Sequence, residues 1–435
     1  MKHTLAAALA IIAMTAPVNA QTEPPLIEEA ELSPISMRAD QVVALLNGDI
    51  AIPLEDVFTP QFLAAVSPDQ LVALSQQLTG QFGAALAVEK LEPSDGTQSA
   101  IEVRMEKAIA KGNIAIDPAQ NNRIGGLVFQ TFEPINDSAE KIQADLDALP
   151  GTTNALLAKI GADGSVDPLF AHNPSQQLAL GSTFKLYVLS ALARSVDAGE
   201  RRWSDIVPLT EKSLPSGMMQ DWPVGAPVTL QTLATLMISI SDNTATDQLI
   251  SVVGRDAIEA ELIASGNSDP SKSIPFLKTR QLFEMRGATE EVTARYLAGD
   301  DDAQRVIIDN LSEGDFSMER TEQVFAAGTP GAIEIEWYAS PEDLAKLMRR
   351  MRSHQSSEAL SVMAVSPQLS GEMLAKWEYA GFKGGSEPGV LNLTWLLTDK
   401  AGDDWILTLG WNNPDAAVET ASLQALSQRL FALVP

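Results

Sequence analysis

A serine and a lysine stand three residues apart, at Ser182 and Lys185, where a strongly apolar stretch begins. On a helix this spacing places both side chains on one face, about one turn apart. A lysine amine that is desolvated and neutral can take the proton of a serine hydroxyl and so make a nucleophile without histidine. The apolar residues after Lys185 predict that this helix runs through the core. The pair therefore indicates covalent, serine-based chemistry.

Composition removes most other kinds of site. The 435 residues include no cysteine, which excludes thiol nucleophiles, disulfides and thiolate metal sites. The three histidines, His3, His172 and His354, are scattered, so we predict neither a metal nor a cofactor. A Ser-His-Asp triad stays open, although no histidine lies in a recognisable motif. The net charge of −27 argues against nucleic acid or an anionic membrane as a partner.

Two further polar motifs follow along the chain. Ser241-Asp242-Asn243 comes after an apolar run and begins a new helix, where such residues also serve as a simple cap. Residues 383–386, Lys-Gly-Gly-Ser, follow an aromatic stretch and precede the predicted strand 390–397. Each motif by itself is weak support for a site.

Motifs this short also arise by chance. Residues 138–141, Ser-Ala-Glu-Lys, repeat the spacing of Ser182 and Lys185, and their acidic surroundings favour a solvated helix start. Residues 400–402, Lys-Ala-Gly, repeat the pattern K-x-G and are interpreted as a hairpin turn. The order of the motifs along the chain therefore carries more information than any one of them.

In order, S-x-x-K at 182–185, S-D-N at 241–243 and K-x-G at 383–385 resemble the serine penicillin-recognising enzymes, and the class A β-lactamases most closely. The resemblance covers roughly residues 146–435. It implies an antiparallel sheet packed against a helical block. It also implies a hydrolase that forms an acyl-enzyme with β-lactams or related amides and esters.

The resemblance implies three catalytic residues. Ser182 is the nucleophile that opens the lactam and becomes acylated. Lys185 is its base or proton relay, and Ser241 passes a proton to the departing lactam nitrogen.

It also implies a substrate-binding set. Asn243 lines the cleft and binds a substrate amide or Lys185, and Lys383 supplies positive charge for the substrate carboxylate. Gly385 and Ser386 complete the set, and the backbone N–H groups of Ser182 and Ser386 form the oxyanion hole.

Three features depart from the family pattern. Gly384 stands where K-x-G normally has a hydroxyl, and Ser386 replaces that hydroxyl only in part. The omega-loop glutamate that activates water in class A enzymes has one candidate here, Glu284, but Ala288 stands where an asparagine is expected. A surface or structural carboxylate is the alternative role for Glu284. Residues 285–332 are interpreted as an acidic insertion near the cleft.

The beginning of the chain predicts export. Residues 1–20 have the basic start, apolar centre and small-residue cleavage site of a signal peptide, so we expect secretion across the inner membrane, into the periplasm. Residues 21–36, rich in Pro, Glu and Ser, predict a flexible leader. No later stretch reaches the length of about 18 apolar residues that a membrane span needs.

The remaining patterns predict an α+β fold in two domains. Residues 37–134 predict a small α+β domain that resembles cystatin-like or nuclear-transport-factor-like domains, because helical patterns give way after Gly83 to alternating strands. Residues 133–150 are acidic with a helical pattern and are interpreted as a linker, 135–145, together with the first helix of the second domain. Residues 146–435 predict the β-lactamase-like domain, with strands at both ends and helices between. The predicted strands are 85–92, 99–106, 107–110 and 123–130 in the first domain, and 155–161, 167–172, 390–397 and 405–411 in the second.

These features together predict an exported serine hydrolase that acts on a small molecule through an acyl-enzyme at Ser182. The chain resembles a subgroup of class A-like proteins with a cystatin-like front domain, in which the deacylating glutamate is often absent. A penicillin-binding sensor that acylates but deacylates poorly, an esterase and a D-alanyl carboxypeptidase stay open as alternatives. The motifs leave the natural substrate and the oligomeric state open.

Overall fold

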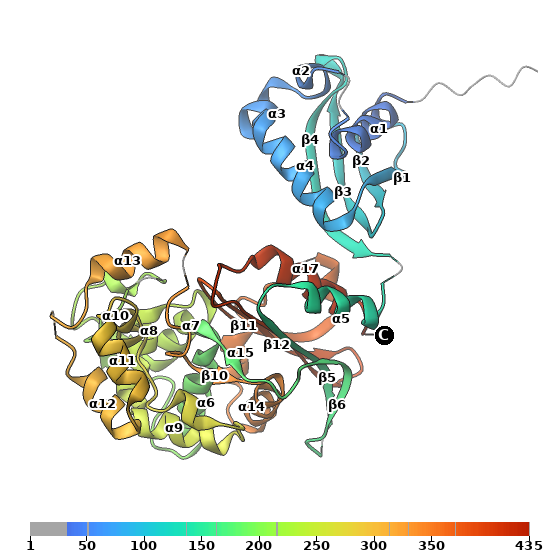
Figure 1. Cartoon of the computed structure of the whole chain (residues 1–435). Helices are drawn as coiled ribbons and strands as arrows, with labels where there is room; N and C mark the ends of the chain where they lie inside the picture. Colours follow the sequence, from blue (N-terminus) through green and yellow to red (C-terminus); the bar gives the residue numbers. More distant parts are fainter. Residues whose placement is uncertain are drawn as a thin grey trace, which may run out of the picture. The chain divides into compact units, whose positions relative to one another are not determined.

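The computed structural model describes residues 33–49, 52–135, 137–161, 163–214, 216–312, 314–328, 330–369 and 371–434 (Figure 1). The predicted signal peptide and most of the predicted leader lie outside these residues. The chain divides into two compact units. The first contains the described residues up to Thr79, with Ala84–Arg104 and Ala110–Thr131, and the second contains Gly80–Gly83, Met105–Ile109 and the residues from Phe132 onward.

The first unit combines helices with a four-stranded sheet of order β1-β2-β3-β4. Its side chains alternate in burial along β2, where Ile101 and Val103 are buried, as the period of two predicted. The elements are α1 (Pro34–Leu46), α2 (Leu54–Val57), α3 (Pro60–Ala65), α4 (Pro68–Phe82), β1 (Ala85–Glu92), β2 (Gln98–Met105), β3 (Ala108–Asp117) and β4 (Arg123–Pro134).

The first helix begins earlier than the sequence indicated. The Ser33 hydroxyl accepts a hydrogen bond from the Ser36 backbone N–H, and Pro34 starts α1, a favourable combination for a helix N-terminus. The predicted end of the leader at residue 36 is therefore wrong.

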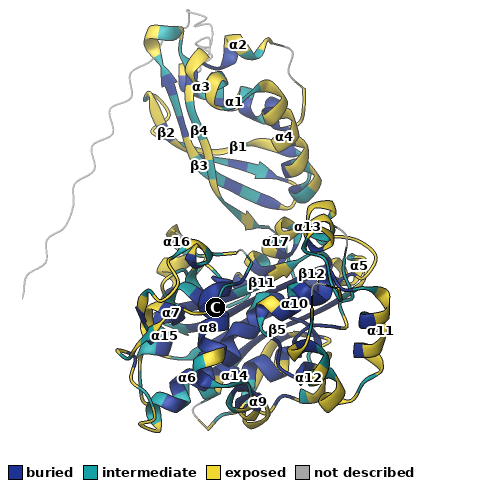
Figure 2. Ribbon diagram, turned by 90° about the vertical axis from the view of Figure 1, so that its left-hand side faces the viewer, coloured by how far each residue is buried: buried dark blue, intermediate teal, exposed yellow. Residues whose placement is uncertain are grey.

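The second unit is built on a five-stranded antiparallel sheet of order β11-β12-β13-β5-β6. Strands from both ends of this unit therefore lie side by side, and the strand predictions at both ends are confirmed. Figure 2 shows the central strands as almost continuously buried. The strands are β5 (Thr152–Ile160), β6 (Val166–His172), β11 (Trp377–Glu387), β12 (Val390–Asp399) and β13 (Asp404–Asn412).

Neighbouring residues of the central strands face opposite layers. Leu156 of β5 and Ile406 of β13 pack with the helical block, whereas Leu157 and Leu407 pack with α5 (Ala139–Ala148) and α17 (Thr420–Phe431). This division follows from the period of two of a strand. Because helices cover both faces, the strands read in the sequence as continuous apolar runs.

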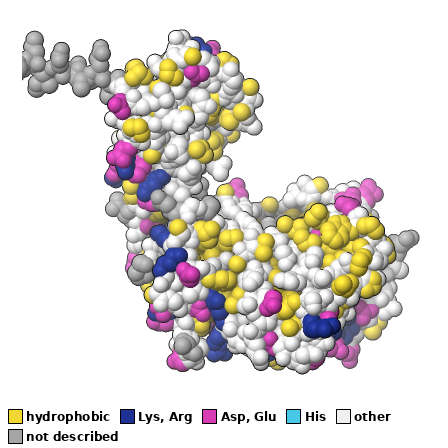
Figure 3. Space-filling view, turned by 180° about the vertical axis from the view of Figure 1, so that it is seen from behind, with side chains coloured by type: hydrophobic (Ala, Val, Ile, Leu, Met, Phe, Trp, Pro, Cys, Tyr) yellow, Lys and Arg dark blue, Asp and Glu magenta, His cyan; other side chains and the backbone are white. Residues whose placement is uncertain are grey.

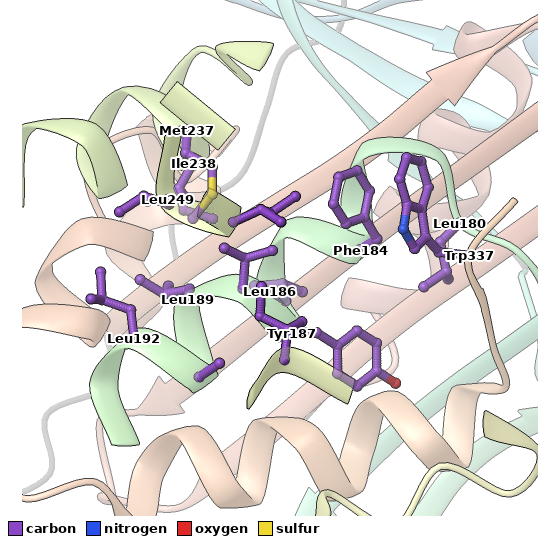
Figure 4. Close-up of a cluster of buried hydrophobic side chains, with 14 of the residues drawn as sticks. Leu180, Phe184, Leu186, Tyr187, Leu189, Leu192, Met237, Ile238, Leu249 and Trp337 are labelled. Atoms are coloured by element: carbon purple, nitrogen blue, oxygen red, sulfur yellow. The ribbon is translucent and has the colours of Figure 1, made fainter. Parts of the chain in front are cut away.

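The helical block packs around α6, whose Leu186, Leu189 and Leu192 are fully buried (Figure 4). The predicted path of this helix through the core is confirmed. None of the helices that the structure describes is long and apolar enough to cross a bilayer. The block contains α6 (Lys185–Asp197), α7 (Leu230–Ser239), α8 (Asn243–Val253), α9 (Arg255–Ala264), α10 (Thr279–Arg286), α11 (Glu290–Ala298), α12 (Asp301–Asp309), α13 (Met318–Ala327), α14 (Pro341–Ser353) and α15 (Glu358–Met363). Helix α16 (Gly371–Ala375) instead packs through Met373 against the layer of α5 and α17.

The predicted linker, 135–145, is mostly helix α5. Ser138 caps this helix, and Ile142 and Leu146, one turn apart, are buried against the sheet. The helical pattern expected for this segment is confirmed, and residues 139–145 belong to the first helix of the second unit rather than to a linker.

The predicted insertion, 285–332, contains α11, α12 and α13. The side chains of Thr289, Asp300 and Ser317 each cap one of these helices by accepting a backbone N–H. Each of these helices buries only one or two residues: Val292 and Tyr296 in α11, Ile308 in α12 and Thr321 in α13.

We expect Phe276→Ala to lower the free energy of unfolding of the second unit by about 3–5 kcal/mol, the usual cost of emptying a buried phenylalanine site. Phe276 is fully buried, with its ring centroid 5.6 Å from that of Phe184 and 6.2 Å from that of Trp337. Urea denaturation followed by tryptophan fluorescence measures this unit alone, because all seven tryptophans lie in it.

The matched control is an apolar residue outside the core. Figure 3 shows hydrophobic side chains exposed on the second unit, and Val224 is 73% exposed. We expect Val224→Ala to change the stability by less than about 0.5 kcal/mol. Equal losses in the two variants would contradict the assignment of Phe276 to the core.

Candidate active site

Ser182 lies in a short 3-10 turn, η2 (Gly181–Phe184), between strand β7 (Leu178–Ala179) and α6. The α-helix proper begins only at Lys185. The prediction that Ser182 and Lys185 share one α-helix is therefore wrong in detail, and their spacing spans a junction between two helix types.

Two contacts fix the turn that carries Ser182. The Leu180 N–H donates to the Trp337 carbonyl at 2.9 Å, next to the pairing of β7 with β10 (Tyr338–Ala339). The rings of Phe184 and Trp337 stack with centroids 3.5 Å apart (Figure 4). Backbone pairing and aromatic packing thus hold both ends of the turn.

Strand β11 passes directly against this turn. A Cβ atom on Gly385 would lie 2.0 Å from the Leu180 carbonyl oxygen and 2.5 Å from the Ser182 nitrogen, so no larger residue fits. A Cβ atom on Gly181, whose φ is +50°, would lie 3.0 Å from the Ser386 nitrogen. The two glycines therefore let the backbones of Ser182 and Ser386 approach each other, as an oxyanion hole requires.

The amine of Lys185 is fully buried and reaches three oxygen acceptors. Its Nζ donates to Asn243 Oδ1 at 2.7 Å, to the Ser241 carbonyl at 2.8 Å and to Ser241 Oγ at 3.0 Å. Burial, and then the neighbouring Lys383, lowers the pKa of Lys185 well below its usual value. The amine therefore reaches its neutral, base-competent form at a lower pH than a surface lysine does.

The hydroxyl of Ser241 lies between two lysines. It accepts from Lys185 Nζ at 3.0 Å and from Lys383 Nζ at 3.1 Å. A hydroxyl has two acceptor lone pairs and one proton to donate. When both lysines are protonated, both lone pairs of Ser241 are engaged, and its own proton is free to point away from the lysines.

The backbone of Ser241 has φ +58°, a left-handed conformation that costs a non-glycine residue about 1–2 kcal/mol. Its neighbour Asp242 stabilises this conformation. Asp242 Oδ1 caps α8 by accepting the Ala245 N–H at 2.8 Å, and Oδ2 accepts the N–H groups of Met218 and Met219 at 2.7 and 2.9 Å. The S-D-N motif is therefore a helix cap and part of the site at once.

Lys383 is buried on β11, and burial lowers its pKa to about 7. The amine therefore carries its charge below that pH and loses it above. Beside it, a Cβ atom on Gly384 would lie 2.8 Å from the Phe382 ring. A hydroxyl residue at 384 would require that ring to move, which gives a physical reason for the missing hydroxyl.

Ser182 lines a pocket of about 480 Å³ together with Asn243 and Ser386. Two further polar residues, Ser216 and Thr279, line it as well. Ser216 donates to the Ser241 carbonyl at 2.6 Å, and nothing in the sequence around it signals this contact. Thr279 lies five residues before Glu284, the candidate water base, and its hydroxyl is visible in the same part of the sequence.

Thr279 is held by a buried carboxylate. Asp247 Oδ1 accepts the Thr279 N–H and the Thr279 hydroxyl, each at 2.7 Å, and Oδ2 accepts the Arg280 N–H at 3.0 Å. Burial raises the pKa of Asp247. Asp247 lies one turn after Asn243 on α8, so one helix face positions both an acceptor of Lys185 and the start of α10.

Glu284, the predicted water base, faces a second pocket of about 610 Å³. Its Oε1 accepts from Arg280 Nε at 2.7 Å. It is not among the described residues that line the pocket of Ser182. The structure therefore does not bring Glu284 and Ser182 together in one pocket.

The wall next to Ser386 rests on a buried ionic cluster. Arg286, the last residue of α10, donates through Nη2 to Glu387 Oε2 at 3.0 Å and to Glu336 Oε1 at 3.1 Å. Burial, and then Glu387, raises the pKa of Glu336 well above its usual range. This cluster, the Arg286 clamp, joins the end of α10 to the segment before β10 and to the end of β11.

The Ser-His-Asp triad that the sequence left open has a structural counterpart that cannot act on a substrate. His354 contacts Ser190 Oγ through Nε2 at 3.3 Å and Asp197 through Nδ1 at 2.9 Å. Ser190 is fully buried and donates to Glu261 at 2.5 Å. Ser190, His354, Asp197 and Glu261 therefore form a hydrogen-bond network that ties α6 to its neighbouring segments.

Both chance repeats of the motifs have the structural roles predicted for them. The Ser138 hydroxyl caps α5 by accepting the Lys141 N–H at 3.3 Å. Residues 400–402 form the turn between β12 and β13, where the Gly402 N–H donates to the Asp399 carbonyl at 3.1 Å.

The chain is similar in sequence to known proteins. A model of the beta-lactamase enzyme family matches residues 137–375, more than half of the chain. A beta-lactamase of Rhodobacter capsulatus is 23% identical over 305 residues, which cover 69% of this chain and 89% of that protein.

Solved structures of two beta-lactamases are also similar to this chain. A beta-lactamase from Sphaerobacter thermophilus DSM 20745 is 27% identical with a TM-score of 0.45, covering 68% of this chain and 98% of that one. A beta-lactamase from Chitinophaga pinensis DSM 2588 is 16% identical with a TM-score of 0.44, covering 68% and 96%. On the match of the family model over more than half of its residues, the chain belongs to the beta-lactamase enzyme family.

Proposed function

We propose that this family member is a class A-like serine hydrolase that forms an acyl-enzyme at Ser182 with β-lactams or related amides and esters. The proposal depends on one observation above all. Ser241 Oγ accepts from both Lys185 and Lys383, beside the pocket that Ser182 lines. Two lysines with lowered pKa values, and a serine hydroxyl within hydrogen-bond distance of both, can supply the base and the proton relay that acylation without histidine needs.

The acylation step uses these groups in turn. Neutral Lys185 takes the Ser182 proton, and Ser182 Oγ attacks the carbonyl carbon, whose oxygen becomes negative and accepts from the N–H groups of Ser182 and Ser386. The carbon–nitrogen or carbon–oxygen bond then breaks. Ser241 gives its proton to the leaving atom and recovers one from protonated Lys185, so no proton is gained or lost.

Hydrolysis of the acyl-enzyme needs a water molecule and a base. Glu284 stays the candidate base from the sequence, but its ion pair with Arg280 and its separate pocket favour slow deacylation. A protein that acylates readily and turns over slowly is therefore our second proposal.

The proposal extends to the rest of the chain. The basic and apolar pattern of residues 1–20 supports export to the periplasm. The order of helices followed by a four-stranded sheet supports a cystatin-like interpretation of residues 37–134.

We expect a fluorescent penicillin to label the full-length protein once, on the peptide that contains Ser182, as measured by mass spectrometry. Ser182→Ala should abolish labelling because Ser182 is the serine of the S-x-x-K motif that lines this pocket. The matched control is Ser138→Ala, which alters the other S-x-x-K motif and should label like the wild type. An undiminished adduct in Ser182→Ala would contradict acylation at Ser182.

The pKa of Lys383 predicts a pH profile. Its charge is lost as the pH rises through about 7, so the second-order rate constant of acylation by a penicillin should fall about tenfold per pH unit above that value. A neutral ester, which has no carboxylate to bind, should show no such fall. Lys383→Arg keeps the charge and should remove the fall. Identical profiles for the two substrates would rule out Lys383 as the carboxylate partner.

We expect Glu284→Gln to change the deacylation rate constant by less than about threefold, because the carboxylate is already engaged by Arg280. Release of the labelled acyl group after a burst, followed over time, measures this constant. A loss of about a hundredfold or more, the size of a general-base contribution, would instead assign the water base to Glu284.

A further inference from the structure

The pocket of Ser182 has an apolar side that the acylation chemistry does not use. If the proposed function holds, this side faces the acyl group of the substrate, so its lining determines which acyl groups fit. The apolar lining residues are Phe184, Leu214, Leu282, Phe283, Phe325 and Trp337.

Helix α13, near the end of the segment 285–332 that the sequence predicts to be an insertion, supplies part of this wall. Phe325 of α13 and Phe283 of α10 lie with ring centroids 5.2 Å apart and planes tilted by 59°. The Thr321 hydroxyl, 1% exposed, donates to the Phe283 carbonyl at 2.9 Å and ties the two helices together. The aromatic pair is therefore a fixed part of the pocket, and it suits an aryl group, which packs edge to face.

The charge of the pocket is one-sided. Its described lining includes two carboxylates, Glu322 and Glu387, and neither a lysine nor an arginine. Glu387 is neutralised by the Arg286 clamp. Glu322 is exposed, and no described residue forms an ion pair with it. It lies one turn before Phe325 on α13, so its charge stands beside the aromatic wall.

We propose that the wall formed by α10 and α13 binds the acyl side chain of the substrate, that it selects aryl acyl groups, and that Glu322 favours a cationic over an anionic substituent on them. The specificity of the site is thus set by α10 and α13, while the catalytic groups lie in η2, at the start of α6, directly before α8 and on β11.

Three penicillins with the same bicyclic core and phenyl ring test the charge. Ampicillin carries an ammonium group beside the ring, benzylpenicillin no charge, and carbenicillin a carboxylate. We expect the second-order acylation rate constants of the full-length protein to fall in that order, with ampicillin about threefold above carbenicillin at low salt, the size of one exposed charge interaction. The ratio should shrink in 1 M salt, which screens charge and leaves shape unchanged.

Glu322→Gln should bring the ratio of ampicillin to carbenicillin close to one. Glu319→Gln removes a carboxylate from an exposed position on the same helix, outside the pocket, and should leave the ratio as in the wild type. A ratio that Glu322→Gln does not change would overturn the role of Glu322.

The aryl preference is tested with 6-acetamidopenicillanic acid, which lacks only the phenyl ring of benzylpenicillin. We expect benzylpenicillin to acylate the wild type about tenfold faster than 6-acetamidopenicillanic acid does. Phe325→Ala should remove most of this difference, and Phe325→Leu should reduce it to about threefold. Equal rates for the two compounds in the wild type would overturn the aryl preference. Absence of any adduct on Ser182 would instead contradict the proposed function, so the two failures are distinct.

Discussion

One amine that must stay out of water, that of Lys185, organises the second unit. An unpaired buried charge costs several kcal/mol, so the fold has to surround this group with acceptors or lower its pKa. It does both: three oxygens lie within 3.0 Å of Nζ, and a second lysine stands nearby. Two of the oxygens belong to Ser241, and its left-handed backbone lets carbonyl and hydroxyl face the amine together.

Helix α8 connects this chemistry to the rest of the pocket. Asn243 at its first turn accepts from Lys185, and Asp247 one turn later holds the first two N–H groups of α10. The aromatic wall then follows along α10 at Phe283. The two halves of the pocket, one polar and one apolar, are thus fixed to the same helix face, so a shift of α8 changes both together.

The polar half could be predicted from the sequence because its residues stand in short motifs of fixed spacing. Ser182, Lys185, Ser241 and Lys383 lie where strands, turns and helix starts bring them, and local patterns indicate such elements well. The strands at both ends of the second unit were also evident, because burial on both faces gives continuous apolar runs.

The apolar half could not be predicted in this way. Phe325 is one aromatic residue on a mostly exposed helix, and its position depends on contacts with α10 and the residues after it, among them Thr321 to the Phe283 carbonyl and Arg320 to the Ala288 carbonyl. The 3-10 turn at Ser182 could not be predicted either, because the turn packs closely against β11 at Gly385, which is far away in the sequence. Contacts of this kind leave no periodic trace.

The Arg286 clamp has a consequence for how such a chain can change over time. Arg286 and Glu336 flank segment 287–335 at its two ends, and Arg286 Nη2 lies 3.1 Å from Glu336 Oε1. The segment is therefore a loop whose ends are held whatever lies between them. The entropy of closing a loop grows only with the logarithm of its length, so a change in the length of this segment costs little closure entropy as long as core residues such as Val292, Tyr296 and Ile308 keep their places. Natural or engineered changes in segment 287–335 can therefore alter which substrates the pocket accepts, while the residues around Lys185 stay unchanged.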